Sequence, residues 1–92
     1  MLFVYSAIDC HNKSELRAKN NPAHVKYVYN HGIKIIHAGP LVCDDGVSPI
    51  GTLIIVEASN RKFVQKFIDN DPYVKAGLFC QISLIAWDKK TS

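Results

Sequence analysis

The sequence lacks a membrane-spanning or signal segment and a paired-cysteine pattern. Either would indicate something other than an ordinary intracellular domain. It has no unbroken apolar run near the roughly 20 residues that a helix needs to cross a bilayer, and MLFVYSAID lacks the basic flank of a signal peptide. Its three cysteines, Cys10, Cys43 and Cys80, form no C-x-x-C pair, which argues against a disulfide framework and a zinc ribbon. We therefore expect a cytoplasmic protein with no membrane partner.

Excess charge and metal-ligand patterns are scarce too. Eleven Lys and Arg face eight Asp and Glu, and the resulting +3 is spread along the chain except at Lys89-Lys90. Such a balance suits a small anionic molecule and does not indicate a nucleic-acid partner. No H-x-H, H-x-x-x-H or Cys/His cluster is present, so we predict no metal and no other cofactor.

The composition that remains is that of one globular domain over residues 1–92, with 48% hydrophobic and 21% charged residues. Four runs rich in β-formers predict strands, and two apolar stripes of helical period predict helices. A short helical turn over residues 14–19 is expected before the first helix, which starts at Asn21-Pro22 and stops at Gly32. Ser59 is expected to cap the second helix. The predicted strands are residues 2–8, 33–42, 51–56 and 78–87.

This order, β-α-β-β-α-β, predicts an α+β fold of the ferredoxin-like plan, with an antiparallel sheet and both helices on one face. Val25, Val28 and Tyr29 are expected to pack the first helix on the sheet. The last strand also carries Phe79, Ile85 and Trp87 on its second side. A bare sheet face of this kind exceeds what monomers usually expose, so we predict a homodimer that packs two sheets together.

Asp71 lies between the second helix and Pro72, and two explanations fit it. As an N-cap before a proline and six residues before Gly77, it suits the start of a short turn without any further role. Alternatively it has a partner, and His24, expected in the first turn of the first helix, would lie near it if the two helices run antiparallel. A carboxylate on one ring nitrogen fixes the tautomer of a histidine base. His24 as a helical polar residue without a role stays the alternative.

Arg17 precedes His24 by seven residues and is a candidate to hold a ligand through its guanidinium group, although an arginine there also suits a surface. Gly39 and Pro40 either let a ligand approach the backbone or end a strand. His11, His31 and His37 are assigned no role.

Taken together, Arg17, Pro22-Ala23-His24, Ala38-Gly39-Pro40, and Asp71-Pro72-Tyr73 with Gly77 resemble the pattern of the YciI-like (YCII-related) family across nearly the whole chain. The resemblance implies a ferredoxin-like fold of the dimeric α+β barrel kind. It also implies a cleft centred on His24 and Asp71, with Tyr73 among the ligand-binding residues. The loop CDDGVSPIG is shorter than in members with inserts there.

The function that follows is a small enzyme without cofactor, in which His24 is the acid or base, Asp71 orients it, and Arg17 with Gly39 positions a small polar or aromatic molecule. Proton transfer, isomerisation or elimination would suit one histidine. The alternative is a binding or accessory domain that catalyses nothing. RNA binding is disfavoured because the third strand, GTLIIVEA, has no aromatic ring to stack on a base.

Overall fold

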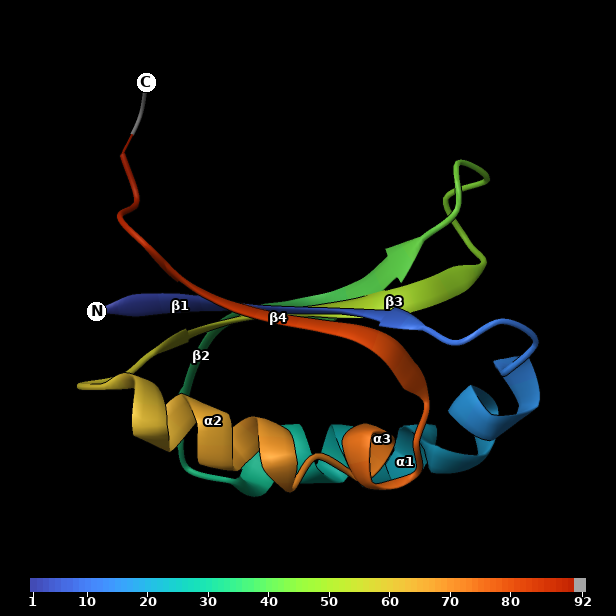
Figure 1. The fold of residues 1–92 in the computed structure, drawn as a ribbon, viewed down its shortest axis with the longest axis horizontal. Coiled ribbons are helices and arrows are strands. Elements are labelled where there is room, and N and C mark those ends of the chain that lie inside the picture. The colour runs from blue at the N-terminus through green and yellow to red at the C-terminus, as the bar shows by residue number, and fades with distance from the viewer. Residues whose placement is uncertain (91–92) are drawn as a thin grey trace.

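The computed structural model describes residues 1–90, and its elements follow the predicted order. Strands β1 (Leu2–Asp9), β2 (Lys34–Val42), β3 (Pro49–Glu57) and β4 (Phe79–Trp87) form an antiparallel sheet in the order β2-β3-β1-β4. Helices α1 (Ser14–Asn30), α2 (Arg61–Asp69) and α3 (Pro72–Lys75) lie together on one face of that sheet (Figure 1). The predicted ferredoxin-like arrangement is confirmed.

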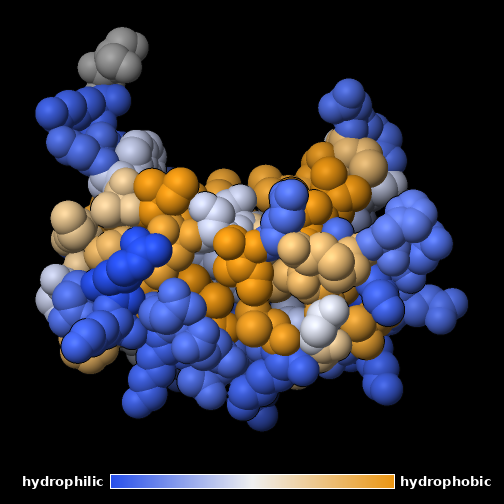
Figure 2. Space-filling model, viewed as in Figure 1, coloured by the Kyte–Doolittle hydropathy of each residue, from blue (hydrophilic) through white to orange (hydrophobic). Residues whose placement is uncertain are grey.

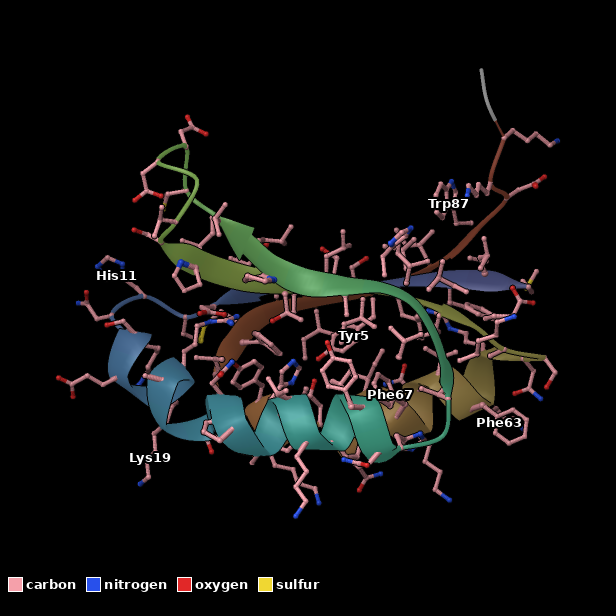
Figure 3. The ribbon with its side chains drawn as sticks, turned by 180° about the vertical axis from the view of Figure 1, so that it is seen from behind. Tyr5, His11, Lys19, Phe63, Phe67 and Trp87 are labelled. Carbon is pink, nitrogen blue, oxygen red and sulfur yellow. A yellow bond between two sulfur atoms is a disulfide. The ribbon has the colours of Figure 1, made fainter. Side chains whose placement is uncertain are left out.

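The core fills the space between the sheet and the helices. Phe3, Tyr5 and Ala7 alternate along β1 toward the helices and are fully buried, because every second side chain of a strand points to the same face. Phe67 of α2 meets Tyr5 edge-on, with ring centroids 6.4 Å apart. Figure 3 shows these two side chains between the layers, whereas Phe63 points outward from α2 and is 59% exposed. The other large core residues are Val28, Ile54, Val56, Val64, Ile68 and Leu84.

Helix α1 is one continuous helix, so the predicted break before Pro22 is wrong. Pro22 removes one helical hydrogen bond, but tertiary packing of α1 on α3 outweighs this local cost. His24 therefore lies in the middle of α1 and not in its first turn. The cap of α2 also differs from the prediction, since Asn60 and not Ser59 accepts the hydrogen bond, from the Phe63 backbone N–H.

Of the three residues predicted to pack α1 on the sheet, Val28 is buried and the other two are not. Arg17, His24 and Val28 are buried, whereas Val25 is 41% and Tyr29 78% exposed. These positions are spaced by seven and four residues, so they share one side of the helix. The consequence is that the helix presents polar side chains, and not an apolar stripe alone, to the inside of the domain.

The second face of the sheet carries apolar side chains and no helix, as predicted. Val4 of β1 lies beside Ile55 and Ile85 in the register, and Leu2 lies beside Trp87. Ile85 is 63% exposed, and Trp87 projects on the side away from the helices (Figure 3). Figure 2 shows apolar atoms gathered along the sheet, between a raised β2–β3 hairpin and a raised C-terminal segment.

Phe79 does not join this bare face, contrary to the prediction. Its ring packs toward the helices, edge-on to Tyr5 at 6.5 Å and to Tyr73 at 5.8 Å. The cause is a register shift in the β1–β4 pair, where Ile8 pairs with Gln81 but Asp9 pairs with Phe79 and Cys80 is skipped. An extra residue of this kind reverses the alternation of the strand beyond it.

Cys10 and Cys80 form a disulfide at this irregularity, so the argument against disulfides was wrong. The pairing joins residues 70 positions apart, and only the strand register brings their Cα atoms to 4.8 Å. Cys43 is exposed and free. Within residues 1–90, no helix combines the length and the apolar character that crossing a membrane requires.

Candidate functional site

Asp71 occupies the junction between α2 and α3 and is completely buried. It is the N-cap of α3, since one carboxylate oxygen, Oδ1, accepts from the Tyr73 backbone N–H at 2.9 Å. Pro72 follows in the first turn and Gly77, with φ of +74°, follows the last residue, as the turn prediction had it. The other oxygen, Oδ2, accepts from the Tyr5 hydroxyl at 2.9 Å. These bonds replace the water that a buried carboxylate loses.

His24 is the third partner of this carboxylate. Its Nδ1 lies 2.7 Å from Asp71 Oδ1, and the histidine is only 8% exposed. Because an ionised carboxylate only accepts hydrogen bonds, Nδ1 carries the proton and Nε2 is the nitrogen left for another partner. The imidazole also stacks on the Tyr73 ring, with centroids 4.0 Å apart and planes 15° from parallel. Both contacts fix the plane of the His24 ring.

Arg17 lies two helical turns before His24 and is held by a second carboxylate, that of the partly buried Asp9. Its Nε and Nη2 donate to the two oxygens of Asp9 at 2.7 and 2.9 Å, and Nη2 also donates to Thr52 at 3.0 Å. Burial lowers the pKa of Arg17, but the hydrogen bonds and charge of Asp9 outweigh it and leave that pKa raised. The guanidinium fork predicted to hold a ligand is therefore occupied by Asp9.

Tyr73 joins the Arg17–Asp9 ion pair to the hydrogen-bonded His24–Asp71 pair. Its ring has the Arg17 guanidinium carbon 4.7 Å from its centroid and stacks on His24. The Tyr73 oxygen accepts from Asn21 Nδ2 at 2.8 Å and from Arg17 Nη1 at 3.4 Å. Since both neighbours donate, the Tyr73 hydroxyl hydrogen is left to donate elsewhere.

A cleft of about 850 Å³ runs along α1, between that helix and the β2–β3 part of the sheet. Five of the six predicted site residues line it, namely Arg17, His24, Gly39, Pro40 and Tyr73. Asp71 lies behind His24 and outside the lining. The remaining walls combine a few polar groups, among them Asn21 and Thr52, with apolar side chains that include Val25, Val28, Tyr29, Val47 and Ile54. Few polar groups in apolar walls are typical of a small-molecule site.

Sequence reasoning missed four residues of this network: Tyr5, Asp9, Asn21 and Thr52. Tyr5 and Thr52 were hidden because a tyrosine or threonine on the inner face of a strand is usually read as core. Asp9 was the one with a usable signal, since it ends an apolar strand eight residues before Arg17. An acidic residue at that place suits an ion pair with the arginine of the following helix.

The charge of Asp71 acts on two tyrosines of the core. Burial, and then the charge and hydrogen bond of Asp71, raise the pKa of Tyr5 well above its ordinary value. Burial and the Asp71 charge likewise raise the pKa of Tyr27 to about 12. Both phenols therefore keep their protons at pH values where an ordinary tyrosine ionises. Within residues 1–90, no group of three or more His, Cys, Asp or Glu side chains is placed to hold a metal ion.

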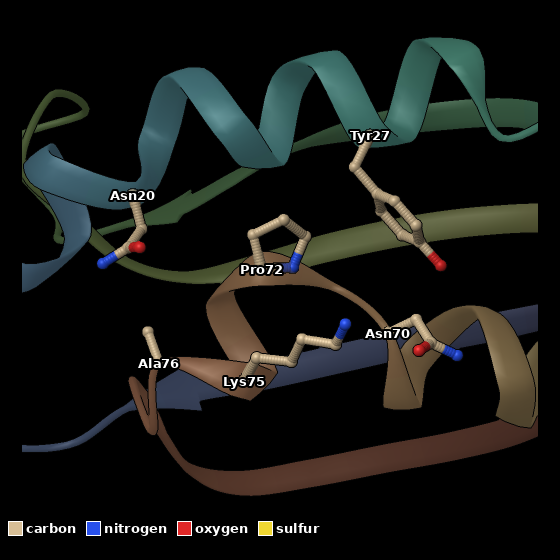
Figure 4. Close-up of a pocket in the computed structure, with 6 residues that line it drawn as sticks. All are labelled: Asn20, Tyr27, Asn70, Pro72, Lys75 and Ala76. Carbon is tan, nitrogen blue, oxygen red and sulfur yellow. The ribbon is translucent and has the colours of Figure 1, made fainter.

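A second hollow lies on the outer side of the helices, between α1 and α3 (Figure 4). It is open and is lined by Asn20, Tyr27, Asn70, Pro72, Lys75 and Ala76. The Asn20 and Asn70 amides donate to carbonyls of their own helices, and the Tyr27 hydroxyl donates to the Phe67 carbonyl. These groups complete the helix packing, so the cleft around His24 is the candidate site.

Comparison with solved structures supports this architecture. The chain is similar to 5-chloro-2-hydroxyhydroquinone dehydrochlorinase (TftG) from Burkholderia phenoliruptrix AC1100, solved with 2,5-dihydroxybenzoquinone, with a TM-score of 0.88 and 32% identity. That match covers 98% of this chain and 96% of the dehydrochlorinase. An antibiotic biosynthesis monooxygenase, at 11% identity and a TM-score of 0.63 over 99% of this chain and all of its own, shares the fold alone. The predicted dimeric α+β barrel class of fold is thereby confirmed.

Comparison of sequences gives the same result. The chain is 30% identical to the protein YciI of Escherichia coli O6:H1 and to that of Shigella flexneri, each over 97% of this chain and 98% of the relative. The model of the YCII-related domain matches residues 1–88. This chain therefore belongs to the YCII-related, or YciI-like, family.

Proposed function

We propose that this protein is an acid–base enzyme that moves a proton on a small hydroxylated or carbonyl-bearing ring compound. The observation that carries the proposal is the His24–Asp71 pair: Nδ1 is held by a buried carboxylate, and the histidine lines an apolar cleft, where Nε2 remains for a substrate. A positioned histidine of this kind contributes typically 10²–10⁴-fold to a proton-transfer step.

The cleft suggests how each residue acts. Nε2 of His24 removes a proton from a ring hydroxyl or from a carbon next to a carbonyl, and Asp71 stabilises the imidazolium that forms. The Tyr73 hydroxyl donates a hydrogen bond to the oxygen that gains negative charge. Arg17 holds Tyr73 and the Gly39–Pro40 segment forms the opposite wall, so their roles are positioning ones.

The substrate class rests on the dehydrochlorinase relative, which binds a dihydroxybenzoquinone. An elimination on such a ring needs one proton removed, a leaving group released with its electron pair, and no oxidant or reductant. One histidine in an apolar cleft meets that requirement. A proton transfer or isomerisation on the same ring would use the same residues.

The test is a steady-state assay with 5-chloro-2-hydroxyhydroquinone, reading chloride release, on the natural chain and on His24→Gln, Asp71→Asn and His37→Gln. His37 lies exposed on β2 and outside the cleft lining, so it is the matched control. We expect kcat to fall by roughly 10²–10⁴-fold in His24→Gln, with KM changed little, and to be unchanged in His37→Gln.

Three results would count against the proposal in different ways. Turnover that survives His24→Gln would remove histidine from the mechanism. Binding of the ring without turnover would favour a binding domain, which is the alternative function. The absence of both binding and turnover would show that the substrate class is wrong.

The bare sheet face supports a homodimer as the assembled form. Ile85 and Trp87 are exposed there in the row formed by Leu2, Val4 and Ile55. Packing this face against a second copy would remove its apolar surface from water, which favours association. Sedimentation of the natural chain at micromolar concentration should give a dimer, and Ile85→Lys should give a monomer. The cytoplasm remains the compartment we propose.

A further inference from the structure

We infer that the Cys10–Cys80 disulfide is a reversible thiol–disulfide exchange site that controls the Asp9–Arg17 ion pair beside the cleft. The disulfide closes the junction where β1 leaves the sheet and β4 enters it. Cys80 is the residue skipped in the β1–β4 register, and the Cys10 backbone N–H donates to the Leu78 carbonyl at 2.8 Å. The proposed catalytic residues do not use this bond.

The disulfide is placed for exchange with an external thiol. Cys80 is exposed and Cys10 is half-buried, so an attacking thiolate has access to the Cys80 side. Exchange needs such access, and buried structural disulfides do not offer it. In a reducing compartment such as the cytoplasm, an accessible disulfide is more often a transient one than a permanent staple.

The step balances with a dithiol as reductant. One thiolate of the dithiol attacks Sγ of Cys80, the Sγ–Sγ bond breaks, and Cys10 leaves as a thiolate that takes up a proton. The second thiol of the reductant then displaces Cys80 from the mixed disulfide. The reductant becomes a disulfide, and the protein gains two electrons and two protons as two thiols.

The disulfide is linked to the Asp9–Arg17 ion pair beside the cleft by the peptide bond between Asp9 and Cys10. Asp9 precedes Cys10, and both of its carboxylate oxygens are bound by Arg17. Arg17 in turn contacts Tyr73, which stacks on His24. Opening the disulfide leaves the chain beyond Asp9 held by the Cys10–Leu78 backbone hydrogen bond without its covalent tie, so the Asp9 carboxylate can leave more easily the geometry that two parallel hydrogen bonds require. Reduction should therefore loosen the support of the Tyr73 ring.

The experiment uses the full chain with Cys43→Ser, so that the thiols counted after reduction come from Cys10 and Cys80. The protein is equilibrated in mixtures of reduced and oxidised dithiothreitol at neutral pH, and its free thiols are counted by alkylation and mass spectrometry. Nitrogen-15 NMR follows hydrogen exchange at the Arg17 Nε–H. We expect reversible reduction with native circular dichroism and an exchange rate raised more than about tenfold, as for a locally opened group.

Two outcomes would overturn the inference. Reduction that proceeds only at the rate of global unfolding would make the disulfide a staple of the fold. Reduction in the native state with unchanged exchange at Arg17 Nε–H would show that the bond does not control the ion pair. The Cys10→Ser/Cys80→Ser variant provides a second test, because it should show the fast exchange without any reductant, and slow exchange there would also count against the proposal.

These readouts require no substrate, so the inference stands or falls separately from the proposed function. Its consequence for catalysis rests on that function. If His24 is the base, the reduced enzyme should lose several-fold in kcat/KM. A redox-insensitive kcat/KM with a redox-sensitive Arg17 signal would instead place Tyr73 outside the reaction.

Discussion

Two carboxylates, the fully buried Asp71 and the partly buried Asp9, contact helix α1, and they are used in opposite ways. Asp9 binds Arg17 through both oxygens, so both partners use most of their hydrogen-bonding capacity on each other, and we call this the closed pair. The His24–Asp71 pair is the open pair. Asp71 binds Nδ1 of His24 and receives two further hydrogen bonds, from Tyr5 and from the Tyr73 backbone. The histidine keeps a second nitrogen that the carboxylate does not reach. The closed pair can only hold position, whereas the open pair can exchange a proton with a molecule in the cleft.

The difference shows that charge and burial alone do not identify a reactive residue. Arg17 and His24 are equally buried, at 6% and 8% exposure, and both face an aspartate. What separates them is the hydrogen-bonding capacity left over after the aspartate is satisfied. An arginine whose fork is filled by a carboxylate has little left for a ligand, while an imidazole always has a second nitrogen.

The largest effect is expected from breaking the closed pair. Arg17→Met keeps much of the side-chain volume but leaves the Asp9 carboxylate, which is only 10% exposed, without its cation, and loss of one partner of a buried pair costs about 3–5 kcal/mol. Urea unfolding should show this loss in the free energy of unfolding. The matched change in the open pair, His24→Leu, should cost less, about 1.5–3 kcal/mol, because it removes one hydrogen bond to a charged group while Asp71 keeps two donors.

An equal cost for the two substitutions would contradict this reading of the two aspartates. It would mean that His24 is as much a structural partner as Arg17. An Asp9→Asn/Arg17→Met double variant separates the effects of charge from those of packing, since it removes both charges together. We expect it to be more stable than Arg17→Met alone.

A smaller effect is expected from removing one support of the open pair. Tyr5→Phe deletes the hydroxyl that donates to Asp71 Oδ2, and a hydrogen bond to a charged group is worth about 1.5–3 kcal/mol. The ring stays, so the edge-on packing on Phe67 is kept. Unfolding experiments should show that loss, and the turnover assay should show a reduced kcat because Tyr5 positions Asp71. Normal stability in Tyr5→Phe would show that this hydroxyl is not needed to hold the carboxylate.

The smallest effect is expected at Tyr27, and it appears in how the free energy of unfolding depends on pH. Tyr27 and Tyr5 have folded pKa values raised above 10.0, partly by the Asp71 charge, so the native state keeps both protons where the unfolded chain loses them. Stability is therefore full below pH 10 and falls above it, and for Tyr27 the fall extends to about pH 12. Tyr27→Phe should cost about 1 kcal/mol at neutral pH, for its bond to the Phe67 carbonyl.

The measurement is the urea unfolding midpoint of the natural chain and of Tyr27→Phe as pH rises from neutral to above 10. The variant should lose stability less steeply above pH 10, because it lacks one of the two phenols. Parallel curves for the two proteins would contradict the raised pKa of Tyr27. Tyr29, which is 78% exposed, provides the matched control in Tyr29→Phe.

The element order and the short turn after α2 could be predicted because each depends on local signals. Alternation marked the strands, and Asp71-Pro72 with Gly77 marked a short turn whatever its surroundings. The continuity of α1 through Pro22 could not be predicted, since packing on α3 decides it. For the same reason the disulfide and the orientation of Phe79 escaped prediction, because both follow from a register shift between distant strands.

Within the site, the residues that stand out chemically were found and those that support them were not. His24, Arg17 and Asp71 are unusual in their sequence positions, whereas Tyr5 and Thr52 look like ordinary inner-face residues of strands. The role of the Arg17 guanidinium group could not be predicted either, because it depends on whether the Asp9 carboxylate faces it. A single sequence predicts which groups are near a cleft better than which of them have hydrogen-bonding capacity left.

Pro40 affects whether copies of this protein can associate through the edges of their sheets. It sits on β2, which is one of the two edge strands in the order β2-β3-β1-β4 and pairs with β3. A proline has no N–H, so a strand that tried to add beside β2 would meet a gap in its ladder. Sideways growth into larger aggregates is therefore discouraged at this margin. The same residue thus lies in the wall of the cleft and at the edge of the sheet.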